Sequence, residues 1–235
     1  GAGLVRLDHA ALEVLNDVDP MITIATVPDY HRVDTDGMIA TIKIISYGVE
    51  EAALLRAGAG VAGALHVLPP VFTTASLIET RVSREIPADK GRRAMAGRLH
   101  RMGLSLSDRV VVPHREAELA KALEEAPGEV LLILTGSATS DPMDVAPQAL
   151  RRAGGSVTRF GMPVDPGNLL FLGDFRGRPV IGLPGCARSP ALNGADWVLE
   201  RVLCGFRVTS SDIAGMGIGG LLKEIPTRPM PRRSD

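Results

Sequence analysis

Residues 135–144 combine one glycine and four hydroxyl side chains with the expected start of a helix. Exposed backbone N–H groups and the positive end of a helix dipole both favour a bound phosphate at such a place. The candidate ligand-binding residues of this loop are Thr135, Gly136, Ser137, Ser140 and Asp141. A purely structural interpretation stays open, because Asp141 as N-cap and Pro142 at the first helical position begin a helix well without any ligand.

Residues 182–190 form a second loop of the same kind, again between an expected strand and an expected helix. Gly185 lets the backbone approach a ligand closely, and Arg188 can pair with an anion. The candidate ligand-binding residues of this loop are Pro184, Gly185, Arg188 and Ser189. The alternative is a plain strand-to-helix turn in which Ser189 and Pro190 begin the helix and Arg188 is solvated.

Other patterns argue against several common chemistries. Residues 58–63 match G-x-G-x-x-G, but an expected helix precedes them and an expected strand follows, which is the wrong context for a dinucleotide. The histidines form no metal-binding pattern, and the chain has neither a P-loop nor a G-x-S-x-G elbow. Cys186 and Cys204 lack metal-binding spacing, which favours a reduced, cytoplasmic setting.

The overall charge and hydropathy exclude two classes of partner. The formal net charge is −1, so no global field attracts nucleic acid. No apolar run approaches the roughly 18 to 20 residues that span a bilayer, so we expect no membrane partner. The local exception is the stretch 81–101, which holds seven basic residues against two acidic ones. It is usual for such a run to be a solvated helix face, but its first residues leave a strand and can reach an anionic ligand.

The elements that must position the two loops alternate between strands and helices of about ten residues. The expected strands are residues 71–82, 109–112, 130–134, 156–160, 169–173 and 179–183, and the expected helices are 89–102, 116–125, 144–153 and 190–203. This alternation predicts an α/β fold with a three-layer, mostly parallel sheet and helices on both faces. Ligands bind beyond the carboxyl ends of strands in such sheets, where both loops fall.

Residues 1–70 have a different texture and predict a small β-containing N-terminal unit. A helical pattern over 4–15 precedes β-like runs at 21–27 and 38–45 and a helix at 50–56. The boundary is expected at Pro69 and Pro70. The α/β domain then spans 71–207, and 208–235 is expected to be a tail or linker. The start without methionine and the basic, proline-rich end suggest a piece of a longer protein.

The two loops, together with two further elements, resemble the molybdopterin-binding domain shared by molybdopterin adenylyltransferase and molybdopterin molybdotransferase. Thr135-Gly136-Ser137 with Asp144 and Pro147 is similar to the family's T-G-G loop, and residues 182–185 match its G-L-P-G turn. Pro166-Gly167-Asn168 resembles its P-G-K element, and residues 83–90 resemble the S-R-G…D-K stretch at its start. The resemblance covers residues 73–205.

The resemblance implies roles for individual residues. Pro166, Gly167 and Asn168 would join the two loops in holding a pterin phosphate, and Asp144 would be the catalytic carboxylate associated with Mg²⁺. Three positions depart from the family, because Ser137, Asn168 and His114 stand where a glycine, a lysine and an acidic residue are expected. Ligand binding is therefore expected to be better preserved than catalysis.

The expected function is binding of molybdopterin in molybdenum-cofactor biosynthesis, with transfer of molybdate to the pterin or processing of an adenylylated pterin as its catalytic form. One alternative is a non-catalytic module that holds the cofactor for a fused or partner nucleotidyltransferase. Another is a related pyridine-nucleotide amidase or pyrophosphatase. The resemblance also implies a homo-oligomer.

Overall fold

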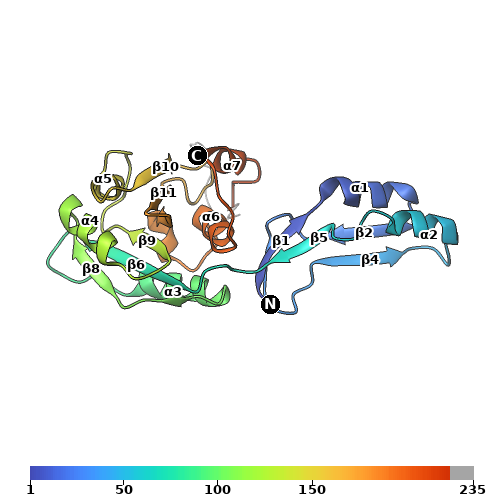
Figure 1. Cartoon of the computed structure of the whole chain (residues 1–235), viewed down its shortest axis with the longest axis horizontal. Coiled ribbons are helices and arrows are strands. Elements are labelled where there is room, and N and C mark those ends of the chain that lie inside the picture. The colour runs from blue at the N-terminus through green and yellow to red at the C-terminus, as the bar shows by residue number, and fades with distance from the viewer. Residues whose placement is uncertain (223–235) are drawn as a thin grey trace, which may run out of the picture. The chain divides into compact units, whose positions relative to one another are not determined.

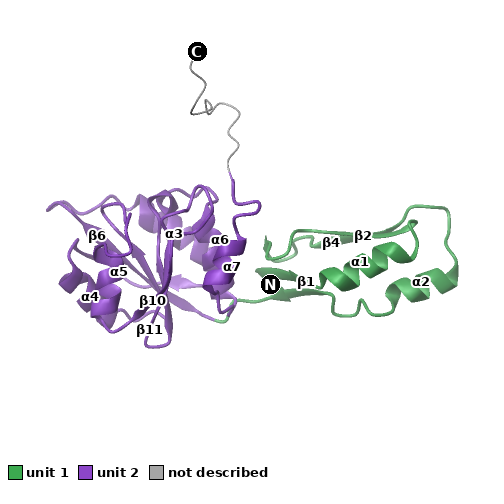
Figure 2. Ribbon diagram, turned by 90° about the horizontal axis from the view of Figure 1, so that it is seen from above, with its two compact units in different colours: residues 1–71 green, residues 72–235 purple. Residues whose placement is uncertain are grey.

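The computed structural model describes residues 1–222, and the chain divides into two compact units, Gly1–Val71 and a second unit that begins at Phe72 (Figure 2). Each unit has its own hydrophobic core. No helix among residues 1–222 is long and apolar enough to span a membrane.

The second unit is built on a seven-stranded sheet in the order β10-β11-β12-β9-β6-β7, with β8 also paired to β6. Strands β12, β9, β6, β7 and β8 are parallel, whereas β11 is antiparallel to both of its neighbours, β10 and β12. This confirms the mostly parallel sheet predicted from the alternation of elements. The strands are β6 (Thr74–Arg81), β7 (Ser105–Leu106), β8 (Val110–Pro113), β9 (Val130–Leu134), β10 (Ser156–Phe160), β11 (Phe171–Phe175) and β12 (Arg178–Gly182).

Helices cover both faces of this sheet (Figures 1 and 2). Helices α4 (Glu116–Glu125) and α5 (Val145–Arg152) pack on one face against Ile78, Leu131 and Ile133. Helices α3 (Lys90–Arg101) and α6 (Gly194–Leu203) lie on the other face. Every residue of β9 is at most 2% exposed, as expected for a strand that is covered on both sides.

The chain around α6 differs from the expected single helix over 190–203. Residues Gly185–Arg188 form a 3₁₀ turn, η1, and α6 begins only at Gly194. Asn193 caps α6, because its side chain accepts from Ala195 N while the Asp196 carboxylate accepts from Asn193 N at 2.9 Å. This capping box fixes the helix start four residues later than the proline suggested.

The segment expected to begin a tail at residue 208 is folded onto the second unit as far as residue 222. It forms α7 (Ser210–Gly215) and buries Val208, Ile213 and Met216. Its end is joined to Asp165, whose N–H donates to Gly220 O at 2.8 Å. The apolar side chains in this segment explain why it packs. The remainder of the predicted tail, residues 223–235, lies outside the described residues.

The first unit contains two small sheets, β3-β1-β5 and β2-β4, and two helices. Its elements are β1 (Gly3–Leu7), α1 (His9–Val18), β2 (Ile22–Thr26), β3 (Arg32–Val33), β4 (Ala40–Ile44), α2 (Glu51–Gly58) and β5 (Leu65–Leu68). The helix predicted over 4–15 was wrong at its start, because Leu4 and Val5 are fully buried in strand β1. Pairing with β5 outweighs the local helical pattern, and the helix begins only after its N-cap, Asp8.

Candidate functional site

The candidate site lies at the carboxyl edge of the parallel strands in the second unit. Strands β12, β9, β6 and β8 are neighbours in that order and run in the same direction. Their last residues are Gly182, Leu134, Arg81 and Pro113, respectively. The two loops predicted from the sequence therefore leave adjacent strands.

Thr80, at the end of β6, connects the first loop to the end of β8. Its hydroxyl accepts a hydrogen bond from Gly136 N at 2.8 Å and lies 2.8 Å from Nδ1 of His114. Because Thr80 has one hydroxyl proton, the simplest arrangement has it donating to an unprotonated Nδ1. Thr80 is 1% exposed, so the hydroxyl at the centre of these two hydrogen bonds is buried, although Gly136 itself is exposed.

His114 occupies the position where the resemblance expects an acidic residue. Burial lowers the pKa of His114 below its usual value, while the charge of Asp144 acts in the opposite direction. The neutral imidazole fits the acceptor role toward Thr80. His114 therefore supports the loop and does not replace a carboxylate.

Arg188 connects the second loop to the first, because its Nη2 donates to the carbonyl oxygen of Thr135. The Thr135 hydroxyl donates in turn to Ser137 O at 2.6 Å and lies 3.2 Å from the Thr139 hydroxyl. The first loop thus folds back on itself at its start. Arg188 was predicted from the sequence as an anion contact. In the structure it is half-buried and donates to Thr135 O.

Arg98, in α3, stabilises the second loop through hydrogen bonds to its backbone. It is 3% exposed and donates to the carbonyl oxygens of Ala187, Ser189 and Ala191 at 2.8–3.0 Å. Its Nε also donates to the buried Asp196 carboxylate at 2.5 Å. The loop conformation therefore depends on a buried cation. Arg98 was not predicted from the sequence, because it lies within a basic run that resembles a solvated helix face.

The two loop glycines differ in what their missing side chains allow. A Cβ on Gly136 would lie 2.6 Å from Thr80 O, so this position needs glycine for the approach to β6. A Cβ on exposed Gly185 would meet only Arg188 Nη1, at 3.6 Å. The apo fold therefore does not require glycine at 185. Its backbone faces open space, as the predicted approach of a ligand needs.

Pro166, Gly167 and Asn168 lie at the N-terminus of α6. Gly194 N donates to Pro166 O at 2.8 Å, and a Cβ on Gly167 would lie 2.6 Å from Gly194 N. Gly167 also has a φ of +142°, which disfavours other residues. Asn168 is exposed, and its carbonyl accepts from Met162 N. This element is fixed to α6, and the exposed Asn168 side chain is left available.

Asp144 organises the first loop by accepting backbone hydrogen bonds. Its Oδ2 accepts from Ser140 N at 2.6 Å and from Asp141 N at 3.0 Å. Asp144 is also the N-cap of α5. The sequence suggested Asp141 as the N-cap, three residues earlier. The Asp141 carboxylate instead accepts from Met143 N at 2.7 Å. Both acidic residues therefore have structural partners in this loop.

Asp144 presents only one free carboxylate oxygen to a Mg²⁺ ion, because its Oδ2 already accepts from two backbone N–H groups. Mg²⁺ is usually held by one or two carboxylates together with water and substrate phosphates. Among residues 1–222, no cluster of three or more histidine, cysteine, aspartate or glutamate side chains could hold a metal. These side chains therefore form no complete metal site by themselves.

A basic cavity of about 480 Å³ adjoins His114 at the ends of β6 and β8. It is lined by Arg81, Val82, Ser83, Arg84, Pro113, His114 and Arg115. Three of these residues are arginines and none is acidic. Arg84 and Arg115 are exposed, while Arg81 is half-buried and donates to Ser83 O at 2.7 Å. The start of the basic run was predicted from the sequence to reach an anion. The contribution of Arg115, which follows β8, was not predicted.

Comparison with known proteins gives the family. A family model described as "Probable molybdopterin binding domain" matches residues 75–203, which is more than half of the chain and lies within the second unit. The chain belongs to this family, as the resemblance at the two loops predicted. No curated protein matches it significantly.

Among solved structures, the chain is similar to that of the molybdopterin biosynthesis MoeA protein from Pyrococcus horikosii. It is 19% identical, and the match covers 77% of this chain and 51% of that chain with a TM-score of 0.42. The present chain therefore spans about half the length of that protein. The family assignment rests on the family model and the loop residues.

Proposed function

We propose that the carboxyl edge of the second unit binds molybdopterin through its phosphate. The observation that carries the proposal is the basic cavity at the ends of β6 and β8, which is lined by three arginines and by no acidic residue. One of the three, Arg115, also lies 3.7 Å from the exposed Glu118 carboxylate, a surface pair that a phosphate can compete with. A phosphate monoester carries up to two negative charges, and arginine forks pair with its oxygens. The neighbouring loop 135–144 adds backbone N–H groups and the N-terminus of α5.

The two loops would hold the pterin beside this phosphate. Thr135, Gly136 and Ser137 present backbone groups from one side, with Ser140 and Asp141 further along the same loop. Pro184, Gly185 and Ser189 belong to the other side, with Gly185 open to solvent. Because Arg188 ties the two loops together, a ligand that contacts one loop also meets a fixed position of the other.

We further propose that this chain holds the pterin without transferring adenylyl groups or molybdate by itself. The support is that Asp144 has only one free carboxylate oxygen and that His114 stands at the expected acidic position. Asp144 is then a positioning residue for the first loop. The resemblance also predicts that the chain holds the cofactor for a fused or partner nucleotidyltransferase and that it forms a homo-oligomer. Both stay predictions.

The proposal is tested by titrating the chain with molybdopterin under anaerobic conditions, followed by turnover assays with ATP and with molybdate. We expect saturable binding and no turnover. Pyridine nucleotides belong in the same assay, because the amidase or pyrophosphatase alternative predicts their hydrolysis. Binding with turnover would support the transferase form, and absence of pterin binding by the folded protein would refute the proposal.

A further inference from the structure

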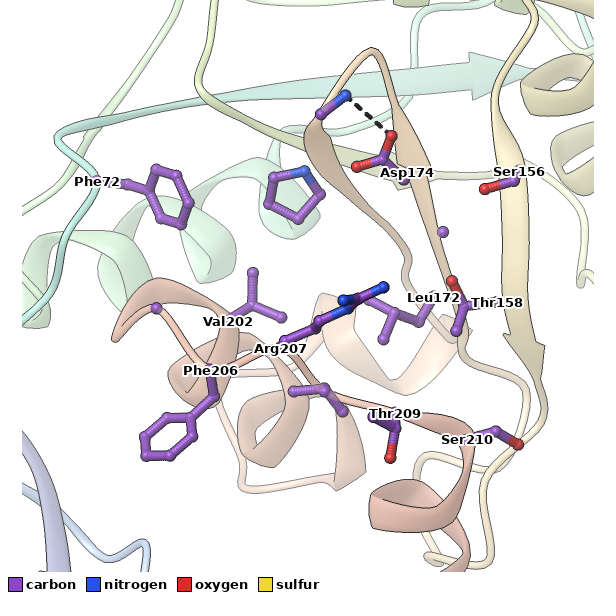
Figure 3. A pocket seen from close by; sticks show the side chains of 15 residues that line it. Phe72, Ser156, Thr158, Leu172, Asp174, Val202, Phe206, Arg207, Thr209 and Ser210 are labelled. Carbon is purple, nitrogen blue, oxygen red and sulfur yellow. Dashed lines mark hydrogen bonds between the residues drawn. The ribbon is translucent and has the colours of Figure 1, made fainter.

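A second cavity of about 730 Å³ opens at the amino edge of the same sheet (Figure 3). Its walls include the start of β10, the β11–β12 turn, the end of α6 and the segment that leads to α7. Ser156 pairs with Asp174 there, and Pro179 lies near the start of β12. The candidate pterin site follows the opposite ends of β9 and β12, so the two sites share no residue.

The floor of this cavity is apolar. Leu172, Val202 and Val208 are buried beneath it, at 5–7% exposure. Phe72 and Phe206 are half-buried and present aromatic side chains near its margin (Figure 3). A pocket of this size with apolar walls is typical of sites for small organic ligands. The Phe72 side chain favours a flat ring, which can stack on it or meet it edge to face.

Arg207 supplies an unpaired cation at this apolar surface. Within residues 1–222 it forms no hydrogen bond or ion pair, and Figure 3 shows its side chain reaching across the cavity toward Leu172 and Thr158. The neighbouring arginines are different. Arg159 donates to Ser210 Oγ at 2.9 Å, and Arg178 donates to Ala126 O at 2.7 Å. Arg207 is therefore available to an anion.

Two hydroxyl groups lie beside this cation. Ser156 and Thr158 of β10 both line the cavity, Thr158 at an irregularity in the pairing of β10 with β11. Neither side chain has a partner in the described part of the chain. The one carboxylate in the lining, Asp174, is engaged by the N–H of Gly177 at 2.9 Å within the turn. The polar groups left free are thus one guanidinium and two hydroxyls, which are complementary to carboxylate or phosphate oxygens.

We propose that this cavity is a second ligand site, which binds a small aromatic anion with its ring on the apolar floor and its carboxylate or phosphate at Arg207. Apolar burial of the ring and charge pairing at Arg207 are both required, because an exposed arginine alone binds anions weakly in salt. The site is independent of the proposed pterin site.

The experiment titrates the chain with 1-naphthyl phosphate and with 1-naphthoate, observed by amide NMR shifts. We expect saturable shifts in residues 156–158, 172–174 and 205–210 with at least one of the two probes, and their relative affinities distinguish phosphate from carboxylate. Arg207→Gln should weaken that binding about ten-fold, which is typical for loss of a charged hydrogen bond. Arg152→Gln is the matched control, because Arg152 is also exposed and unpaired but lies in α5. Its affinity should be unchanged.

Two further measurements separate this site from unspecific binding. Thr158→Trp should fill the cavity and abolish the shifts while Arg207 is still present. Neutral 1-naphthol and inorganic phosphate alone should each bind at least about ten-fold more weakly than the aromatic anion. Equal affinity for 1-naphthol, equal loss in Arg152→Gln, or shifts confined to residues outside the cavity would overturn the proposal, whatever the result with molybdopterin.

Discussion

Arg188 in the second loop donates a hydrogen bond from Nη2 to the carbonyl oxygen of Thr135 in the first loop. These two residues are 53 positions apart in the sequence, and this contact joins the turns that follow β12 and β9. A pterin-binding surface made from two loops requires a fixed distance between them. The Arg188–Thr135 contact supplies that constraint directly.

Replacement of Arg188 by methionine should therefore weaken molybdopterin binding more than it weakens the fold. The variant loses a charged hydrogen bond and the register between the loops, so we expect about a ten-fold higher Kd. Titration calorimetry measures the affinity, and a thermal melt measures the fold. Arg188→Lys keeps the charge but loses the planar fork, so its affinity for molybdopterin should lie between those of the methionine variant and the original chain. Equal affinity of the methionine variant and the original chain would contradict this role.

Thr80→Val should destabilise the protein by about 1 kcal/mol, because it removes the acceptor of the Gly136 N–H and the partner of His114 Nδ1. Valine has nearly the same shape as threonine, so packing changes little. Thr80→Ser is the control that keeps the hydroxyl, and it should retain most of the stability. Urea unfolding measures the difference between the two variants. If both lost the same free energy, the methyl group and not the hydrogen bonds would be responsible.

The pH dependence of stability follows from His114. Burial lowers its pKa in the folded protein, so the unfolded chain takes up the proton first as the pH falls. This contribution to stability is complete above the unfolded pKa of about 6.5 and is lost as the pH falls through the folded value. The melting temperature should therefore fall more steeply below about pH 6.5 in the original chain than in His114→Gln. Parallel profiles would show that His114 does not contribute.

Two glycine variants separate the requirements of the fold from those of the ligand. Gly136→Ala should reduce stability, because its Cβ would approach Thr80 O to 2.6 Å. Gly185→Ala should leave the melting temperature nearly unchanged, because its Cβ meets only the flexible end of Arg188. If a pterin approaches this backbone, Gly185→Ala or the larger Gly185→Val should still lower the affinity. Full affinity in Gly185→Val would remove the second loop from the site.

Much of the fold is predictable because strands and helices alternate with clear apolar patterns. The five apolar residues 130–134 identify the central strand β9, and the loop after it is where ligands bind in such sheets. Strand β1 was missed because pairing with β5, distant in sequence, decides the conformation of Leu4 and Val5. The apolar pattern of one segment contains no information on its pairing with a strand that is distant in sequence.

The supporting residues of the site were harder to predict than its loops. Thr80 and Arg98 act through contacts with segments 56 and 89 or more positions away. Nothing in its local sequence distinguishes Thr80 from an ordinary strand residue. For Arg98 the one local signal is the apolar spacing of α3, which places Arg98 beside buried Leu99 and Met95.

Asp144→Asn tests whether magnesium acts through this side chain. Asparagine keeps one oxygen for the N–H groups of Ser140 and Asp141, so we expect a loss of about 1 kcal/mol or less. Because the carboxylate serves the loop, any magnesium response of pterin binding should be the same in both proteins. Parallel calorimetric titrations with and without MgCl₂ measure it. A magnesium response that disappears in the variant would restore Asp144 as a metal ligand.

The most direct measurement is the affinity of the chain for molybdopterin, compared with the same pterin after removal of its phosphate. A paired Arg84→Gln, Arg115→Gln variant removes the two exposed charges of the basic cavity without touching either loop. If the phosphate lies in this cavity, the original chain should bind molybdopterin at least about ten-fold more tightly than the dephosphorylated pterin, and the paired variant should lose most of that preference. Equal affinity of the folded chain for both pterins, or a preference that persists in the variant, would contradict the proposed site.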